Sequence, residues 1–344
     1  MTAASRIGGR WGRRLLGLLI AVIIVPPAGF FLTRGVLAAA NAVLERRYPP
    51  PGRMIPVGDH RLHLFCQGSG TPTVVIEPGL GVDWVAWAPV VMDLARSVEV
   101  CVYDRAGYGW SEPGPIPRTA QQSAEELHHL LSSSKRQGPY VIVAHSFGGH
   151  IARAYAGKHG STLGGVVLVD PADQNPDEMP VQPAPAARPA SWSRGWIVDS
   201  LPPLGWERVK RLRRGEDGLS ADVRTLPVAF RHRAIIASSL NQLAAEQSEL
   251  DSARVSQIQA RAAVFPRDVP LVVITPLYLS TPRSRSATPP SLARRELQRK
   301  IAESSALGTQ VFAGESGHMV HVDQPELVVT VVRDVMSRAR RERQ

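Results

Sequence analysis

Cysteine is scarce in this sequence, since the 344 residues include only Cys66 and Cys101. Two cysteines exclude a disulfide-rich secreted scaffold and a zinc site built from four cysteines. The ten histidines are scattered without the spacing of metal ligands, so we predict neither a metal site nor a cofactor. With 44% hydrophobic residues, a chain of this length can instead bury an ordinary hydrophobic core.

Lysine is scarce too, because only four of the 40 basic residues are lysine and the rest are arginine. The formal net charge of +10 would suit nucleic acid or an anionic membrane surface as a partner. The arginines are scattered or occur as short pairs, without interleaved aromatic residues or a nucleic-acid-binding motif. We therefore interpret the charge as a solvated surface and predict no nucleic-acid partner.

Charge is absent from residues 15–32, an apolar run interrupted only by small residues and by the pair Pro26-Pro27. Eighteen residues in a helix span about 27 Å, enough to cross the hydrocarbon core of a bilayer. We therefore interpret residues 1–47 as a membrane anchor. Four arginines precede the run, which favours a cytoplasmic N-terminus and an extracytoplasmic domain. The alternative is a cleaved signal peptide with its hydrophobic region at Leu15–Val25, which would leave a secreted protein.

After the anchor, Tyr48–Gly52 is rich in proline and is interpreted as a stiff linker. From Arg53 onward, short apolar runs bounded by Gly and Pro alternate with helix-like stretches, a pattern typical of an α/β protein. Eight strands are predicted, at Arg53–Val57, Arg61–Gln67, Thr73–Glu77, Val98–Tyr103, Tyr140–Ala144, Gly165–Val169, Leu271–Thr275 and Gln310–Phe312. Helices are predicted at Trp87–Arg96, Thr119–Ser133, Gly148–His159 and Gln324–Arg341.

Residues 171–265 are too many for a single connection between the sixth and seventh strands. They include a Pro/Ala-rich stretch, three tryptophans and helical patterns near Ala221–Gln259. Insertions of this length are usually functional, so we interpret residues 171–265 as a cap over the active site. The predicted core domain then consists of residues 53–170 and 266–344.

Serine chemistry is indicated by the sequence around Ser146, which follows an apolar strand and opens a helix. A nucleophilic serine on such a sharp turn adopts strained dihedral angles, which requires small residues two positions before and two positions after it. Ala144 and Gly148 meet that requirement. The turn directs the neighbouring His145 and His150 away from the serine, so we interpret both as packing or surface residues.

A serine hydroxyl is a poor nucleophile until a base removes its proton. His318 follows a Gly-rich turn between the last strand and the last helix and is the predicted base, with His321 as the competing candidate. The oxyanion that forms on the substrate requires two preorganised N–H donors. We predict the backbone N–H of Phe147, directly after the serine, and that of Leu80 in the glycine-bearing loop after the third strand.

Several motifs together resemble the α/β-hydrolase superfamily and occur in its order. The resemblance covers about residues 53–340, and the chain most resembles bacterial membrane-anchored serine α/β-hydrolases. It implies an α/β-hydrolase fold with an eight-stranded, mostly parallel sheet, helices on both faces and a helical cap. It also implies that Asp104 and Arg105 belong to a structural loop. The motifs are PGLG at Pro78–Gly81, YDRAGYGWS at Tyr103–Ser111, AHSFGG at Ala144–Gly149 and GHMVHVDQPE at Gly317–Glu326.

The resemblance also bears on the two cysteines. The strand order of this fold, 1-2-4-3-5-6-7-8, would place Cys66 at the end of the second strand close to Cys101 in the fourth. An extracytoplasmic domain would favour a disulfide between them. Two buried free thiols are the alternative.

The acid that orients the histidine has to be located separately. Relatives usually carry it after the seventh strand, but residues 276–295 of this chain contain no Asp or Glu. Pancreatic lipases carry it after the sixth strand in an Asp-Pro-Ala context, and here that strand leads into Asp170-Pro171-Ala172-Asp173. Asp170 is therefore the predicted acid, with Asp173 as the alternative.

These residues predict a serine hydrolase that cleaves a carboxylic ester through an acyl-enzyme intermediate. The predicted anchor and hydrophobic cap favour an apolar or lipid-like ester. A serine at this position argues against epoxide hydrolases and haloalkane dehalogenases, which place Asp there. An acyltransferase would use the same residues with an alcohol in place of water. A third hypothesis, a non-catalytic binding protein, is supported only by the missing acid after the seventh strand.

Overall fold

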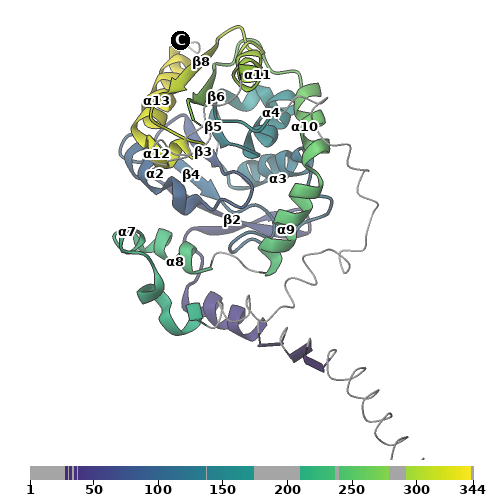
Figure 1. Cartoon of the computed structure of the whole chain (residues 1–344), viewed down its shortest axis with the longest axis vertical. Coiled ribbons are helices and arrows are strands. Elements are labelled where there is room, and N and C mark those ends of the chain that lie inside the picture. The colour runs from purple at the N-terminus through teal and green to yellow at the C-terminus, as the bar shows by residue number, and fades with distance from the viewer. Residues whose placement is uncertain are drawn as a thin grey trace, which may run out of the picture.

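A sheet of eight strands forms the centre of the protein (Figure 1). The computed structural model describes residues 28–341, except for residues 30, 33–34, 37, 137, 174–209, 237–239 and 279–291. The strand order is β1-β2-β4-β3-β5-β6-β7-β8, with β2 antiparallel to both of its neighbours and all other pairs parallel. The strands are β1 (Arg53–Val57), β2 (His60–Gln67), β3 (Thr73–Glu77), β4 (Val100–Tyr103), β5 (Tyr140–His145), β6 (Leu163–Val169), β7 (Leu271–Pro276) and β8 (Gly308–Ala313).

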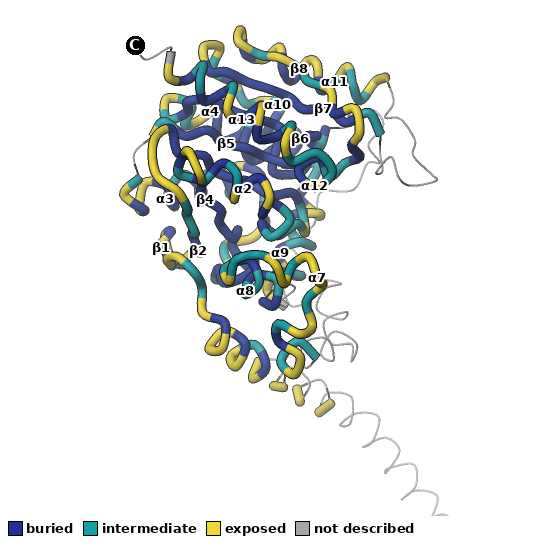
Figure 2. The backbone as a smooth tube through the Cα atoms, turned by 90° about the vertical axis from the view of Figure 1, so that its left-hand side faces the viewer, coloured by how far each residue is buried: buried dark blue, intermediate teal, exposed yellow. Residues whose placement is uncertain are grey.

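Helices cover both faces of the sheet, which explains why its central strands are nearly continuous runs of Val and Ile. These strands are dark blue along their length in Figure 2, which marks buried residues. Val74 and Ile76 pack with helices α2 and α13 on one face, whereas Val75 packs with α3 and α4 on the other. The main helices are α2 (Ala88–Leu94), α3 (Ala120–Ser133), α4 (Gly148–His159), α11 (Leu292–Ala302), α12 (Val320–Asp323) and α13 (Pro325–Arg341).

The predicted fold, an eight-stranded and mostly parallel sheet with helices on both faces, is confirmed. The strands lie where the sequence predicts them, with ends that differ by a few residues. Helix α11 was not predicted. Its sequence is mostly polar, and it buries only Gln298, Ile301 and Ala302.

Residues 174–209 of the predicted cap, which include its three tryptophans, lie outside the described residues. Helix α10 packs against α3 and α4, and its side chains complete the N-terminus of α3. Ser256 Oγ accepts from the N–H of Ala120 at 2.9 Å, and Gln259 Oε1 accepts from the N–H of Gln121 at 3.0 Å. The elements of this part are η5 (Gly215–Gly218), α7 (Ala221–Arg224), α8 (Val228–Ile236), α9 (Leu240–Asp251) and α10 (Ala253–Ala262).

The segment before β1 contacts the core domain. Residues 38–47 are helical, and Tyr48 is buried. The indole N–H of Trp110 donates to the carbonyl oxygen of Tyr48 at 3.0 Å, and the carbonyl of Pro51 contacts the ring of His63. Residues 1–27, which carry most of the predicted anchor, lie outside the described residues. Among the residues that are described, no helix has both the length and the apolar character to span a bilayer.

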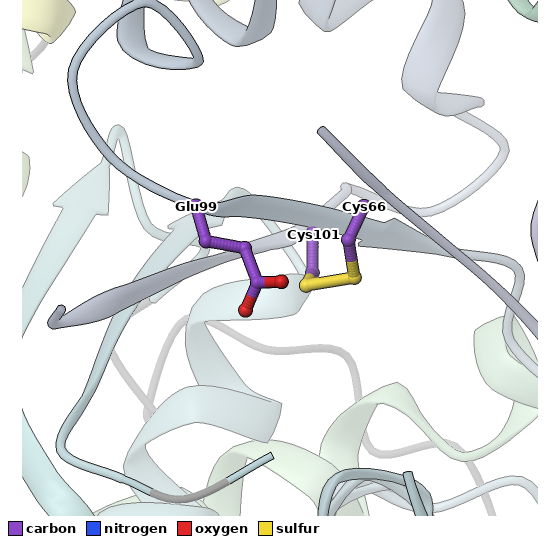
Figure 3. Close-up of side chains that lie close together, drawn as sticks. All are labelled: Cys66, Glu99 and Cys101. Carbon is purple, nitrogen blue, oxygen red and sulfur yellow. A yellow bond between two sulfur atoms is a disulfide. The ribbon is translucent and has the colours of Figure 1, made fainter. Parts of the chain in front are cut away.

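Cys66 of β2 and Cys101 of β4 lie directly opposite each other and form a disulfide (Figure 3). The carboxylate of Glu99 lies near the two sulfur atoms. This group is the only candidate metal-binding cluster in the described part of the chain. Because the sulfur atoms of Cys66 and Cys101 are joined in the disulfide, neither is a thiolate that could ligate an ion. The disulfide replaces the alternative of two free thiols.

Candidate active site

Ser146 lies on a tight turn between the end of β5 and the start of α4. Its φ is 52°, a left-handed conformation that is strained for a residue with a side chain. The N–H of Ser146 donates to the carbonyl of Val169 at 3.1 Å, so the turn is tied to the neighbouring strand. Gly148 allows the turn to approach the loop after β3, since a Cβ there would lie only 2.6 Å from the carbonyl oxygen of Glu77.

The hydroxyl of Ser146 lies 3.1 Å from Nε2 of His318, which the loop after β8 carries. Nδ1 of the same imidazole lies 2.6 Å from Oδ2 of Asp170. Asp170 directly follows β6 and, like the serine, has a positive φ, of 40°. Its N–H donates to the carbonyl of Ile274 on β7 at 2.8 Å. Serine, histidine and aspartate thus form one chain of hydrogen bonds at the carboxyl ends of three strands.

The loop after β3 lies against this chain. A Cβ on Gly79 would be 3.2 Å from Cβ of Ser146 and 2.7 Å from Nδ1 of His145, so only glycine permits this approach. Within the described residues, the backbone N–H groups of Leu80 and Phe147 donate to no acceptor. Both therefore remain available as donors beside the serine.

A sequence profile of the alpha/beta hydrolase family matches residues 74–331, which include the serine turn and the histidine loop. The chain belongs to the alpha/beta hydrolase family. The match covers most of the sheet, from β3 to the middle of α13. The residues of the hydrogen-bonded chain all fall within it.

The chain is similar in sequence or fold to several known proteins, with modest sequence identity. The uncharacterised protein YqjL of Bacillus subtilis is 38% identical over 106 residues, which cover 31% of this chain and 42% of YqjL. The chain spans less than half the length of the first curated relatives it matches. The crystal structure of the enol-lactonase from Burkholderia xenovorans LB400 has 20% identity and a TM-score of 0.54, covering 83% of this chain and 100% of that one. A thermophilic esterase from Thermogutta terrifontis has 20% identity and a TM-score of 0.53, covering 83% and 97%.

In this member of the family, the carboxylate next to the histidine is held by α11. Oδ1 of Asp170 accepts from Arg294 at 2.9 Å and from Gln298 at 2.7 Å. Burial tends to raise the pKa of Asp170, but the hydrogen bond with His318 and the charge of Arg294 outweigh burial and leave the pKa below its usual value. Asp170 is therefore ionised at neutral pH. Arg294 and Gln298 could not be identified from sequence, because nothing in the residues around them relates them to the site.

Asp173 and His321, the alternative candidates for the acid and the base, make other contacts. Asp173 accepts hydrogen bonds from Arg153, Gln257 and Arg261, at 3.2, 2.8 and 2.6 Å. His321 is fully buried and stacks on Trp87, with ring centroids 4.1 Å apart. Burial, with a smaller effect of His318, lowers the pKa of His321 to about 3. Neither of its ring nitrogens has a hydrogen-bond partner among the described residues.

His145 lies beside the histidine that contacts Ser146. Its Nε2 donates to the carbonyl oxygen of His318 at 3.0 Å, and the two ring centroids are 4.6 Å apart. Burial, with smaller effects of His321 and His318, holds the pKa of His145 well below its usual value, so its imidazole is neutral. His145 therefore packs against the histidine loop and fixes its backbone. His150, which was also predicted to be a packing or surface residue, is buried, and burial lowers its pKa to about 4.

Proposed function

We propose that the protein is a serine hydrolase that cleaves carboxylic esters through an acyl-enzyme intermediate. The observation that carries the proposal is the chain of hydrogen bonds from Ser146 through His318 to Asp170, with separations of 3.1 and 2.6 Å. A serine next to a base that is itself oriented by an acid is the arrangement that activates a hydroxyl nucleophile. The left-handed turn at the serine and the free N–H groups beside it support the same reaction.

In the proposed acylation, Nε2 of His318 removes the proton from Ser146 as Oγ bonds to the ester carbonyl carbon. The carbonyl electrons move onto oxygen, where the N–H groups of Leu80 and Phe147 stabilise the negative charge. When the carbonyl reforms, the bond to the alcohol breaks and the histidine returns the proton to the leaving alcohol. Water, activated by the same histidine, then releases the acid. Asp170 stays ionised throughout and holds the imidazole in the required tautomer.

The substrate we propose is an apolar or lipid-like ester, on the basis of the apolar segment at residues 15–32. The catalytic domain is proposed to lie outside the cytoplasm, either anchored in the membrane or secreted. The disulfide between Cys66 and Cys101 supports that location, because disulfides persist mainly in oxidising compartments.

A fluorophosphonate probe tests the proposal, because it reacts only with an activated serine. Wild-type protein should be labelled, whereas Ser146→Ala should not. Ser132→Ala changes an exposed serine on α3 and should be labelled like wild type. Folded wild-type protein that remains unlabelled would contradict the proposal.

A panel of p-nitrophenyl esters of increasing acyl length then tests the substrate class. We expect longer acyl chains to give higher kcat/KM than acetate. A preference for acetate would exclude the apolar substrate while leaving the reaction intact. Product analysis with an added alcohol separates hydrolysis from acyl transfer, since only an acyltransferase would yield mainly the new ester.

A further inference from the structure

Arg105 binds the loop that carries one of the two proposed oxyanion donors. Its Nη1 donates to the carbonyl oxygen of Pro78 at 2.7 Å, and its Nη2 donates to that of Gly79 at 3.0 Å. The side chain is only 3% exposed. The resemblance to the α/β-hydrolase superfamily implies a structural loop at Arg105, whereas the guanidinium contacts the backbone of the loop next to Ser146.

The contact with Gly79 acts on the proposed donor itself. The carbonyl of Gly79 and the N–H of Leu80 belong to the same peptide unit, and in a trans peptide they point in opposite directions. A guanidinium that holds the carbonyl therefore fixes the direction of the N–H. Its positive charge also polarises the peptide, which makes the N–H a stronger donor.

Arg105 is in turn held by two carboxylates from distant parts of the chain. Its Nη1 donates to Glu77 at 2.8 Å, at the end of the strand that leads into the loop. Its Nε and Nη2 donate to the two oxygens of Glu249 at 2.8 and 3.0 Å, a bidentate pair with a residue that is fully buried. Glu249 lies on α9, within the insertion between β6 and β7.

A second contact joins α9 to the same loop. The hydroxyl of Tyr108 donates to Glu249 at 2.7 Å and accepts from the N–H of Gly81 at 3.4 Å. Glu249 is therefore connected to the loop on both sides of Leu80. Any displacement of α9 would leave a buried guanidinium without one of its two carboxylates.

We propose that Arg105 is a positioning residue for the oxyanion donor at Leu80, and that helix α9 of the insertion sets its position through Glu249. This inference rests on the proposed function, since it assigns a device to the same active site. In this proposal the insertion helps to position the oxyanion donor, in addition to covering the substrate. Arg105 acts through the N–H of Leu80 while negative charge develops on the substrate oxygen. It therefore stabilises the transition state more than it strengthens substrate binding.

The test compares Glu249→Gln and Arg105→Lys with a matched control, Arg261→Gln. Arg261 lies on α10 and pairs with Asp173 at 2.6 Å, so its variant also removes an ionic contact between the insertion and the core. Each variant is assayed with p-nitrophenyl butyrate for kcat and KM, and its thermal unfolding verifies that it folds. Affinity for butylboronic acid, which forms a tetrahedral adduct with an active-site serine, provides a readout that a merely structural role would not change.

For Glu249→Gln and Arg105→Lys, we expect kcat to fall at least about 10-fold with KM within about two-fold, since loss of a whole oxyanion donor costs about 100- to 1,000-fold. Boronate affinity should fall in proportion to kcat/KM, whereas Arg261→Gln should leave both near the wild-type values. Folded variants with wild-type kcat, or a loss equal to that of Arg261→Gln, would overturn the inference alone. Wild-type protein that reacts with neither the fluorophosphonate probe nor the ester would overturn the proposed function, and the inference with it.

Discussion

The carboxylate of Asp170 and Nδ1 of His318 lie 2.6 Å apart, although 148 positions separate the two residues in the chain. The aspartate follows β6 and the histidine follows β8, and β7 lies between these strands in the sheet. The side chain of Asp170 therefore reaches past β7, which is the strand after which relatives usually carry the acid. Arg294 and Gln298 of α11 bind its other oxygen and hold it in this direction.

Replacement of this carboxylate is the most direct test of its role. Asp170→Asn should lower kcat by about 1,000- to 10,000-fold, because an amide no longer stabilises the imidazolium and favours the wrong tautomer of the histidine. Asp173→Asn is the matched control, since Asp173 pairs with Arg153 and Arg261 instead. Steady-state kinetics with a p-nitrophenyl ester measures the kcat of both variants. Equal losses in the two variants would refute the assignment of Asp170.

The buried His321 should make the protein sensitive to acid. Its pKa of about 3 in the folded state lies below the ordinary value of 6.5, so the unfolded chain binds the proton more tightly. The stability of the folded state is therefore complete above pH 6.5 and decreases as the pH falls towards 3. Between pH 6.5 and 5, this one group should cost about 2 kcal/mol of the free energy of unfolding.

His321→Phe should reduce that loss, because phenylalanine keeps the stacking on Trp87 and has no proton to bind. Urea unfolding at pH 5 and 6.5 measures the difference. His129→Phe, which changes an exposed residue of α3, should show the same pH dependence as wild type. If His321→Phe loses as much stability as wild type between the two pH values, His321 is not the group responsible.

The disulfide should contribute strongly to stability. Cys66 and Cys101 are 35 positions apart, and closing a loop of that size is expected to stabilise the folded state by about 4 kcal/mol. Unfolding by guanidinium should therefore show a loss of this size in Cys66→Ser/Cys101→Ser. Alkylation of the unfolded wild type before and after reduction checks the bond itself. Two alkylated cysteines before reduction would show that the bond had not formed.

Gly148 should tolerate no side chain. The Cβ of Gly148→Ala would lie 2.6 Å from the carbonyl oxygen of Glu77 and 2.7 Å from that of Pro78, and neither backbone atom can yield without moving the loop after β3. We expect kcat to fall by at least about 10-fold, since the proposed donor at Leu80 would be displaced. Gly35→Ala, which has no neighbour within 4 Å, should behave like wild type. Unchanged kcat in Gly148→Ala would show that the close approach is dispensable.

Much of this architecture could be predicted from sequence because the signals are local. Runs of Val and Ile bounded by Gly and Pro identify strands such as β3 and β5, whose burial on both faces requires such residues. The serine turn is recognisable because Ala144, Ser146 and Gly148 satisfy a steric requirement within five positions. His318 follows from its place after the last strand.

The remaining contacts depend on tertiary structure. Arg105 and Glu249 are 144 positions apart, and neither sequence neighbourhood indicates that they form a pair. Helix α11 is mostly polar, and nothing local in its sequence relates Arg294 or Gln298 to Asp170. Local sequence also could not separate Asp170 from Asp173, since their different roles depend on the direction in which the chain turns after β6.

The positive φ angles of Ser146 and Asp170 have a consequence for how activity is lost. Each such conformation costs about 1–3 kcal/mol and does not persist in an isolated segment. The bonds that hold them run to the next strand, from Ser146 to Val169 and from Asp170 to Ile274. This geometry therefore depends on the assembled sheet, and we expect a partly folded form to lose it. Turnover and far-ultraviolet circular dichroism should disappear together in denaturant, so an activity assay also counts native molecules.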